Sequence, residues 1–342
     1  MKRMAMAFLI LFVAQTLPAQ DWARAALEKS PRHREWVTVK HDGRSVEAFV
    51  VYPEVNHKAP VVLIIHEVYG MTDWVQDLAD QVAGAGYIAI APDLLSGIGP
   101  AGGRTSSFSH SGAIEAVSHL NPAQITADLN AAADYALKLP AADGRLYVAG
   151  FCWGGGQSFR FATNRHDLSA AFVFYGTPPD KDAMSRITAP VYGFYAGNDA
   201  RISLTVPSTR ETMKSLGKKY EAVIYAGAGH GFMRAGEAPG ASEENLNART
   251  QAWVRWTQLL AHARRPPAGA RMHKTETAEQ SIDCGLGMET VRLAARHFRL
   301  ALTGFRMRSC QCHIPSGTGL CGSVHQPRVP PNALPRDVAQ SG

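Results

Sequence analysis

The sequence predicts a doubly wound α/β fold, in which a mostly parallel sheet is flanked by helices, in one domain over residues 21–264. Two observations predict this fold class. Continuous apolar runs such as VVLIIH (61–66) and YIAIAP (87–92) have the composition of strands that are buried on both faces. Segments with helical periodicity lie between these runs, and such alternation is typical of parallel sheets covered by helices.

The expected strands share β-branched or aromatic enrichment and are Trp36–Lys40, Val46–Tyr52, Pro60–His66, Tyr87–Ala91, Arg145–Gly150, Ala170–Tyr175, Val191–Ala196 and Glu221–Ala226. The first two are expected to pair as an antiparallel hairpin that turns at His41-Asp42-Gly43-Arg44. The expected helices are Asp73–Gly84, Ala123–Leu139, Trp153–Thr163, Pro207–Leu216 and Ser242–Ala263. Asn121-Pro122 provides an N-cap and a first-turn proline for the second of them.

The segment Ser96–His119 interrupts this alternation because it is rich in glycine and serine. Loops of this length in compact domains are usually functional or disordered. The segment follows a strand that ends at Pro92, which places it at the carboxyl edge of the sheet. Ligands bind at that edge in α/β folds, so we expect the segment to lie near the functional site.

Residues 1–20 have the pattern of a secretory signal peptide. Lys2 and Arg3 precede an apolar run from Met4 to Ala14, and small residues follow before the end of the segment. The run is shorter than the roughly 20 apolar residues that a membrane-spanning helix needs. We therefore expect an exported protein, periplasmic or secreted, with no stable membrane anchor after signal cleavage. A helix packed on the domain is the alternative.

The net charge of +6 and the pI near 9.1 arise mainly from the two ends of the chain. Residues 1–20 carry +2 and residues 265–342 carry +5, whereas residues 21–264 carry −1. The main body therefore lacks the basic excess that is typical of nucleic-acid-binding proteins, and we expect no nucleic-acid partner.

Residues 265–342 form a basic tail that contains four of the five cysteines, Cys284, Cys310, Cys312 and Cys321. The last three and His325 are zinc-ligand types, but they lack the paired C-x₂-C spacing of zinc sites. Disulfide pairing of the four cysteines is another alternative. Weak periodicity beyond Arg265 favours a disordered extension over a metal or nucleic-acid module.

The candidate nucleophile is Cys152, within Gly150-Phe151-Cys152-Trp153-Gly154-Gly155. This segment follows an expected strand and opens an expected helix, which is the context of a nucleophile elbow with Cys in place of Ser. The helix N-terminus favours the thiolate, and the backbone amide of Trp153 is expected to face a developing oxyanion. A buried structural cysteine in a Gly-rich turn is the alternative.

Two further residues are expected to complete a catalytic triad. Asp199 and His230 each follow an expected strand, so both belong at the same sheet edge as Cys152, and their order along the chain is acid and then histidine. His230 would accept the thiol proton and later protonate the leaving group, while Asp199 would orient the imidazole. Each residue taken alone is also compatible with an ordinary loop position.

These residues together resemble the dienelactone hydrolase family of the α/β-hydrolase fold, over about residues 34–262. The resemblance rests on the segments His66-Glu67-Val68-Tyr69-Gly70, Ala91-Pro92-Asp93-Leu94, Gly-Phe-Cys-Trp-Gly-Gly, Gly-Asn-Asp and Ala228-Gly229-His230-Gly231-Phe232-Met233-Arg234. It implies that Glu67 interacts with the thiol and helps to deprotonate it once substrate is bound. It also implies that the amide of Val68 is the second oxyanion donor and that Arg234 pairs with carboxylates.

The resemblance further implies a resting Glu67–Arg234 pair, which would divert Glu67 from Cys152 and protect the thiol from oxidation in an exported protein. The alternatives are a solvated carboxylate at position 67 and a surface arginine at position 234. The family's Arg and Tyr after the Pro-Asp-Leu segment are missing here, where Leu95-Ser96-Gly97-Ile98-Gly99 stands instead. Arg104 in the following segment is a candidate substitute for holding a substrate carboxylate.

The sequence therefore predicts a carboxylic ester hydrolase that cleaves a small-molecule ester or lactone through a Cys152 thioester. No metal or organic cofactor is expected, since neither H-E-x-x-H nor G-x-x-x-x-G-K-[ST] occurs. The alternatives are a thioesterase or peptidase on the same site, and a non-catalytic binding or thiol-sensing protein on the same scaffold. The residues do not predict the natural substrate or the oligomeric state.

Overall fold

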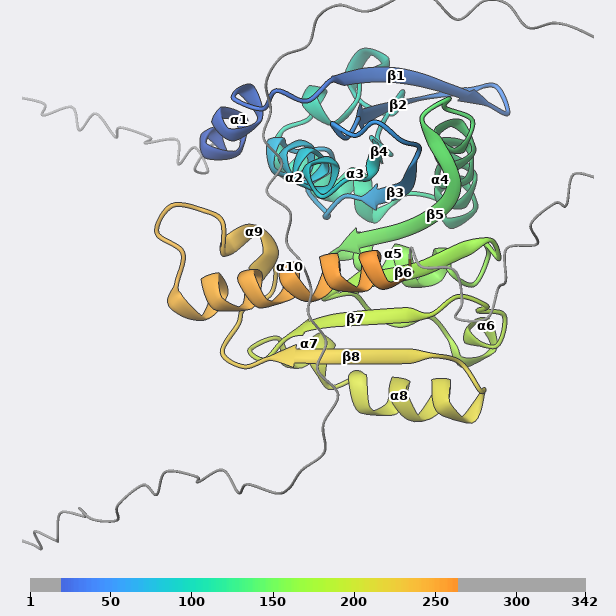
Figure 1. Ribbon diagram of the computed structural model, residues 1–342, viewed down its shortest axis with the longest axis vertical. Helices are drawn as coiled ribbons and strands as arrows, with labels where there is room; N and C mark the ends of the chain where they lie inside the picture. Colours follow the sequence, from blue (N-terminus) through green and yellow to red (C-terminus); the bar gives the residue numbers. More distant parts are fainter. Residues whose placement is uncertain (1–19, 264–342) are drawn as a thin grey trace, which may run out of the picture. The chain divides into compact units, whose positions relative to one another are not determined.

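The computed structural model describes residues 20–263 (Figure 1). The expected tail and, apart from Gln20, the expected signal peptide lie outside the described residues. Within the described range, no helix is both long enough and apolar enough to cross a membrane.

A single sheet of eight strands runs through the described part of the chain; its strands are β1 (Arg34–His41), β2 (Arg44–Val51), β3 (Ala59–Ile65), β4 (Ile88–Pro92), β5 (Ala142–Phe151), β6 (Leu168–Phe174), β7 (Val191–Ala196) and β8 (Tyr220–Tyr225). Their order in the sheet is β1-β2-β4-β3-β5-β6-β7-β8. Strand β2 pairs antiparallel with β1 and β4, and the remaining neighbours pair in parallel. The mostly parallel sheet predicted from the sequence is confirmed.

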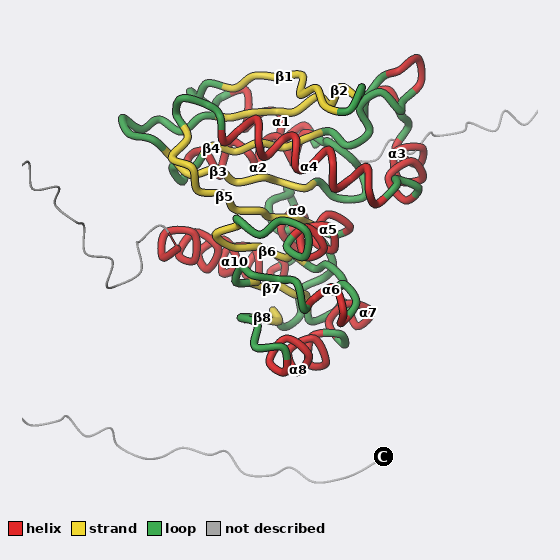
Figure 2. Tube along the Cα trace, turned by 90° about the vertical axis from the view of Figure 1, so that its right-hand side faces the viewer, coloured by secondary structure: helices red, strands yellow, loops and turns green. Residues whose placement is uncertain are grey.

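The helices are α1 (Asp21–Glu28), α2 (Asp73–Gly84), α3 (His110–Ser118), α4 (Pro122–Leu137), α5 (Trp153–Phe161), α6 (Lys181–Met184), α7 (Ala200–Ser203), α8 (Val206–Ser215), α9 (Phe232–Ala235) and α10 (Glu243–Ala263). Two short 3₁₀ helices, η1 (Pro100–Gly102) and η2 (Thr105–Ser107), precede α3. Helices α1, α2 and α10 cover one face of the sheet, and α4, α5 and α8 cover the other. Figures 1 and 2 show α5 and α10 on opposite sides of β6.

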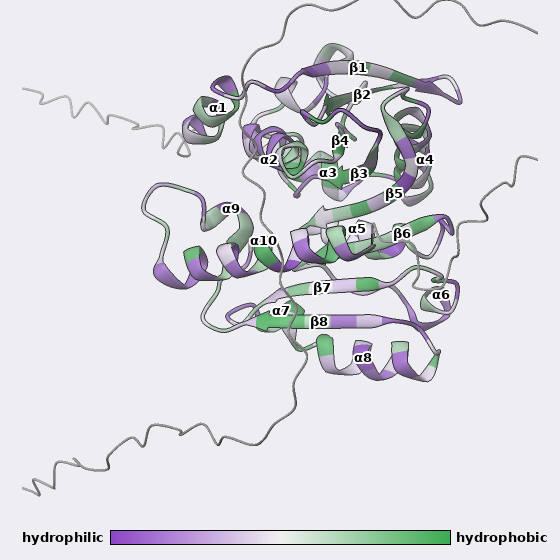
Figure 3. Ribbon diagram, viewed as in Figure 1, coloured by the Kyte–Doolittle hydropathy of each residue, from purple (hydrophilic) through white to green (hydrophobic). Residues whose placement is uncertain are grey.

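Alternate residues of the central strands enter two separate hydrophobic cores. In β5, Tyr147 and Ala149 belong to the core beneath α2 and α10, whereas Leu146 and Val148 belong to the core beneath α4 and α5. All residues of β3 and β4 are buried, and both strands are largely apolar in Figure 3. Burial on both faces explains why these strands appear in the sequence as continuous apolar runs rather than as alternating patterns.

Two local sequence signals produce the expected turns and caps. Asp42 and Gly43 both have positive φ, 46° and 74°, which is the backbone of a type I′ hairpin turn between β1 and β2. The Asn121 side chain accepts hydrogen bonds from the N–H groups of Ala123 and Gln124, at 2.8 and 3.3 Å, and so caps α4.

The segment Ser96–His119 is not one long loop, because it contains η1, η2 and α3. Asp93 at the end of β4 accepts hydrogen bonds from the N–H and hydroxyl of Thr105, at 3.0 and 2.7 Å. Ser109 caps α3 by accepting from the N–H of Gly112. The expectation of a continuous loop was wrong because these two polar anchors order a glycine-rich stretch that has little periodicity of its own.

Candidate active site

The carboxyl edge of the parallel strands brings together the three residues of the expected triad. Cys152 lies between β5 and α5, Asp199 lies three residues after β7, and His230 lies in the turn between β8 and α9. Parallel strands end at the same edge of a sheet, so side chains that are up to 78 positions apart in the chain meet there.

Cys152 occupies a strained backbone position, with φ 57° and ψ −119°. The turn around Cys152 leaves no room for a side chain at Gly150 or at Gly154. A Cβ atom at Gly150 would lie 1.9 Å from the carbonyl oxygen of Gly154, and one at Gly154 would lie 2.3 Å from that of His66. These glycines therefore allow α5 to approach β3 and β5 closely enough to present Cys152 at the sheet edge.

The triad side chains form a continuous chain of hydrogen bonds. Cys152 Sγ lies 3.0 Å from His230 Nε2, and His230 Nδ1 lies 2.5 Å from Asp199 Oδ2. Asp199 is buried and the His230 side chain is about one third exposed, so the carboxylate is shielded while the imidazole and the sulfur face the pocket. The structure thus brings Cys152, His230 and Asp199 together as the sequence predicts.

The protonation of His230 is set by both of its partners. The hydrogen bond to Cys152 and the contact with Asp199 outweigh partial burial and raise the pKa of His230 to about 9. A histidine with a raised pKa is a stronger base toward the thiol proton, and the proton it gains is then held at Nε2. That atom faces Cys152 and, beside it, the pocket.

Two backbone N–H groups beside Cys152 are available as oxyanion donors. Trp153 is the first residue of α5, and Val68 follows Glu67 in the turn after β3. Both residues line the pocket that contains Cys152, and neither N–H has an acceptor among residues 20–263. His66 supports this turn, since its Nδ1 lies 2.7 Å from the carbonyl oxygen of Glu67 and its ring stacks on Trp153.

Glu67 and Arg234 form an ion pair near the triad, in which only the carboxylate is buried. Arg234 Nε donates to Glu67 Oε2 over 2.7 Å, and the glutamate side chain is only 2% exposed. Burial raises the pKa of Glu67, and Arg234 opposes that rise. The resting pair that the resemblance implies is present, and Glu67 is not the solvated carboxylate of the alternative interpretation.

The pocket at Cys152 has a volume of about 450 Å³ and is lined by Val68, Cys152, Trp153, Gly156, Gln157, Arg160, Tyr175, Thr177, Pro178, Pro179, Arg201, Ile202 and His230. Arg104 does not line it. Its guanidinium instead stacks on the ring of Trp36 in β1, 3.6 Å from the ring centroid. The structure therefore separates Arg104 from the other candidate residues, because the loop that carries it is anchored at Asp93 and turns toward β1.

Several pocket residues are not singled out by sequence reasoning. On α5, Gly156, Gln157 and Arg160 lie three, four and seven positions after Trp153, and this spacing places all four on one helix face. The spacing is a signal that helical periodicity could have found. Arg201 comes from α7 and the segment Thr177–Pro179 from the loop after β6, and only the tertiary structure brings them to Cys152.

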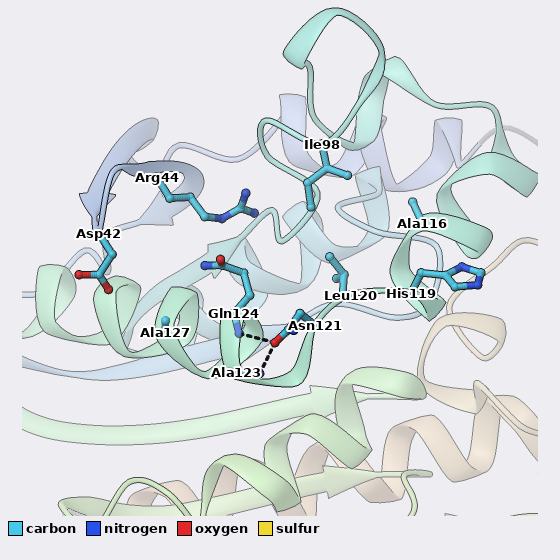
Figure 4. A pocket seen from close by; sticks show the side chains of 10 residues that line it. All are labelled: Asp42, Arg44, Ile98, Ala116, His119, Leu120, Asn121, Ala123, Gln124 and Ala127. Carbon is cyan, nitrogen blue, oxygen red and sulfur yellow. Dashed lines mark hydrogen bonds between the residues drawn. The ribbon is translucent and has the colours of Figure 1, made fainter.

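A larger hollow of about 660 Å³ lies between the β1–β2 turn and the start of α4 (Figure 4). It holds no triad residue. Its Arg44 is paired with Asp128, and its His119 bonds through Nδ1 to the carbonyl oxygen of Glu115. The nucleophile, base and oxyanion donors gather at the smaller pocket, which is therefore the candidate active site. No cluster of three or more His, Cys, Asp or Glu side chains suited to a metal ion occurs within residues 20–263.

The chain matches the model of the dienelactone hydrolase family over residues 46–264. A similar curated protein is the "Putative carboxymethylenebutenolidase" of Salmonella typhi, 29% identical over 233 residues that cover 64% of this chain and 84% of the relative. A second relative with the same printed name, from Methylorubrum extorquens, is 30% identical over 55% of this chain and 68% of its own.

Among solved structures, the "Putative Dienelactone Hydrolase" of Klebsiella pneumoniae subsp. pneumoniae is 26% identical, with a TM-score of 0.58 over 66% of this chain and 98% of the other. The dienelactone hydrolase of Anabaena variabilis shares the fold at 20% identity and a TM-score of 0.52, over 68% of this chain and 98% of its own. The chain belongs to the dienelactone hydrolase family of the α/β-hydrolase fold, and as a member it is a hydrolase of ester or lactone bonds.

Proposed function

We propose that the protein hydrolyses a small-molecule ester or lactone through a covalent thioester at Cys152. The observation that carries this proposal is the chain Sγ–Nε2–Nδ1–Oδ2, with contacts of 3.0 and 2.5 Å, beside two backbone N–H groups that have no acceptor among the described residues. A nucleophile, its base, the orienting acid and an oxyanion site are the groups that acyl transfer needs.

In the first half of the reaction, His230 Nε2 takes the proton from Cys152 while Sγ bonds to the substrate carbonyl carbon. The carbonyl electron pair moves to the oxygen, which accepts hydrogen bonds from the N–H groups of Trp153 and Val68. The tetrahedral adduct then collapses, the carbon–oxygen ester bond breaks, and His230 protonates the departing alkoxide. With a lactone, that alcohol remains part of the acyl group.

In the second half, His230 takes a proton from water, whose oxygen attacks the thioester carbonyl carbon in the same oxyanion site. The carbon–sulfur bond breaks, the acid leaves, and the proton on His230 returns to Sγ. Asp199 keeps Nδ1 protonated throughout, so that Nε2 is the atom that exchanges protons. Glu67 helps to deprotonate Cys152 once substrate is bound, as the family resemblance implies.

The test is turnover of p-nitrophenyl acetate by the full chain and by Cys152→Ala, with the far-UV spectrum as a check on folding. Activity is expected to disappear in the variant while the spectrum stays native. Intact-mass measurement in the presence of a slowly hydrolysed ester should show one acyl group that forms and decays on the wild type and is missing in the variant. Retained turnover in Cys152→Ala would contradict the nucleophile assignment.

A comparison of substrate classes separates the alternative functions. A thioesterase or peptidase would hydrolyse acyl thioesters or peptides faster than esters and lactones of the same acyl group, so all four classes are compared on one preparation. A binding or thiol-sensing protein would form no acyl group that turns over. We expect esters or lactones to give the highest kcat/KM.

We also propose that the protein is exported, to the periplasm or the medium. The support is the basic residues and short apolar run of residues 1–20. Intact-mass measurement of protein recovered from the periplasmic and extracellular fractions is expected to show a chain shortened by about 20 residues. Full-length protein found only in the cytoplasmic fraction would overturn this proposal.

A further inference from the structure

The turn that carries Val68 is closed by hydrogen bonds to its own backbone. The Gly70 N–H donates to the carbonyl oxygen of Glu67 over 3.1 Å, and His66 Nδ1 lies 2.7 Å from the same oxygen. The peptide group between Glu67 and Val68 is planar and trans, so the direction of this carbonyl oxygen fixes the opposite direction of the Val68 N–H. The direction of one proposed oxyanion donor therefore depends on what holds the far end of the turn, at Gly70 and Met71.

The far end of the turn is held by Thr105, a residue that neither lines the pocket at Cys152 nor belongs to the triad. Its hydroxyl oxygen accepts a hydrogen bond of 3.0 Å from the N–H of Met71, and the same hydroxyl donates one of 2.7 Å to Asp93. Thr105 is the first residue of η2 and lies 34 positions after Met71 in the chain. One side chain thus joins the turn after β3 to the end of β4.

Thr105 also fills the space that a side chain would need at Gly70. A Cβ atom on Gly70 would lie 2.4 Å from the hydroxyl oxygen of Thr105 and 2.7 Å from its Cγ2, and Gly70 has a positive φ of 75°. The turn adopts this backbone and meets Thr105 so closely only because Gly70 has no side chain. The contact and the neighbouring hydrogen bond together restrict Gly70, whose own N–H holds the carbonyl oxygen of Glu67.

The segment between β4 and α4, which contains η2, also packs against both proposed oxyanion donors. Leu95 and two residues of α3, Ala113 and Val117, form a small buried cluster. The side chains of Val68 and Trp153 pack against this cluster. No residue of the segment lines the pocket at the nucleophile, so the segment reaches the site through the two donors and the turn that carries one of them.

We propose that Thr105 is a positioning residue, whose hydroxyl holds the turn after β3 so that the Val68 N–H is directed at the oxyanion. This inference rests on the proposed function, since the oxyanion forms only when a carbonyl is attacked at Cys152. Thr105 touches no reacting atom and acts through Met71 and Gly70. Its hydroxyl aligns the donor before substrate arrives, and such preorganisation favours the transition state over the substrate.

The test uses Thr105→Val, which keeps the branched shape of the side chain and removes the hydroxyl. The Asp93 carboxylate keeps hydrogen-bond donors in this variant, because it also accepts from the N–H groups of Leu95 and of residue 105 itself. The anchor of the loop therefore persists while the hydrogen bond to Met71 is lost. Thr105→Ser keeps the hydroxyl and is the rescue variant. Thr105→Ala also lacks the hydroxyl and replaces Thr105→Val if the added methyl group prevents folding.

The matched control is Thr209→Val, the same substitution at a residue of α8 that does not line the pocket. It also removes a hydroxyl that donates over 2.7 Å, in this case to the carbonyl oxygen of Thr205. The far-UV spectrum and the Tm of every variant show how much folded protein each preparation contains.

The measured quantity is the ratio of kcat/KM for phenyl acetate to that for its thiono analogue, in which sulfur replaces the carbonyl oxygen, on the full chain. Sulfur is a weaker hydrogen-bond acceptor than oxygen, so the thiono ester depends less on the oxyanion donors. In Thr105→Val, kcat/KM is expected to fall on the order of tenfold for phenyl acetate, mainly through kcat, and by no more than about twofold for the thiono ester. Thr105→Ser and Thr209→Val are expected to keep the wild-type ratio. A mere loss of folded enzyme would lower both rates alike and leave the ratio unchanged.

Hydrogen exchange, read by mass spectrometry on peptides that span 66–75, tests the contact without turnover. The Met71 N–H is expected to exchange faster in Thr105→Val than in the wild type, and Thr105→Ser should match the wild type. If phenyl acetate is not hydrolysed but exchange follows this pattern, the proposed function fails and the hold of Thr105 on the turn stands. If phenyl acetate is hydrolysed and Thr105→Val keeps the wild-type ratio, or changes it no more than Thr209→Val does, the positioning role alone fails. Exchange that is unchanged in Thr105→Val would overturn the hold on the turn itself.

Discussion

Arg234 holds Glu67 through a 2.7 Å hydrogen bond between Nε and Oε2, and this contact places a cation against a carboxylate that is only 2% exposed. The arginine side chain itself is 28% exposed, so one partner is reachable from solvent while the other is not. Loss of Arg234 from this contact would therefore leave Glu67 as an unpaired buried charge, which is costly.

Removal of the arginine is expected to destabilise the fold because it leaves that buried carboxylate unpaired. Arg234→Gln should lower the free energy of unfolding by about 3 kcal/mol at pH 8, measured by urea denaturation. At pH 5 the loss should be smaller, since burial raises the pKa of Glu67 and a protonated Glu67 needs no cation. Glu67→Gln/Arg234→Gln should recover most of the loss. Equal losses in the single and double variants would contradict the role of the pair.

The raised pKa of His230 predicts a stability that declines in alkali. Its folded-state pKa is about 9 and its ordinary value is 6.5, so the folded state holds the proton more tightly. This contribution is fully present below pH 6.5 and is lost as the pH rises through about 9. Cys152→Ala removes the largest cause of the shift, so its Tm should fall less than that of the wild type between pH 6 and 9.5.

Partial exposure of His230 makes this effect smaller than the full shift would give. The matched comparison is His230→Gln against Cys152→Ala/His230→Gln. The difference between their Tm values at each pH measures the contribution of the thiol's own ionisation. After the contribution of the thiol is subtracted, Tm values that fall equally with pH in wild type and Cys152→Ala would count against the hydrogen bond between Cys152 and His230.

The strands and the triad were predictable because their signals are local. Strands such as β3 are apolar on both faces, and the glycines around Cys152 stand together in one short strand-to-helix segment of the sequence. Asp199 and His230 follow from the rule that parallel strands end at one edge. Chain order and strand position therefore sufficed to place three distant residues together.

The features of the fold and the site that the sequence did not predict depend on contacts between distant segments. Helix α3 forms in a glycine-rich stretch that is anchored by Asp93, and nothing in the stretch itself identifies that anchor. Arg104 stacks on Trp36 because the loop turns toward β1, which its sequence does not specify. Arg201 reaches the pocket from α7, and only the packed structure shows that it lines the same pocket as Arg160.

Two glycines on α5 provide a matched test of the nucleophile elbow. Gly154→Ala would place a Cβ atom 2.3 Å from the carbonyl oxygen of His66, whereas Gly156→Ala would meet the hydroxyl of Thr177 at 3.1 Å. The first change is expected to cost about 3 kcal/mol in urea unfolding, because two backbone segments must separate. The second should lie within about 1 kcal/mol of wild type, since alanine favours the helix. Similar midpoints for the two variants would show that α5 does not pack as closely as described.

Asp77 in α2 predicts a variant that is more stable than the wild type near neutral pH. Burial raises the pKa of Asp77 to about 6, from an ordinary value of 3.8, and the hydrogen bond from Gln81 Nε2 only partly offsets this. A raised carboxyl pKa means that the folded state binds the proton more tightly, so stability falls as the pH rises from 3.8 through about 6. Asp77→Asn lacks this loss and keeps an oxygen acceptor for Gln81.

The expected gain for Asp77→Asn is about 1–3 kcal/mol at pH 7.5 and about a third of that at pH 4.5, in urea unfolding at both pH values. Asp182→Asn is the control, because Asp182 is exposed on α6 and its substitution should change stability little at either pH. A loss of stability in Asp77→Asn that is the same at both pH values would mean that the charged carboxylate is better accommodated in the folded state than its burial indicates.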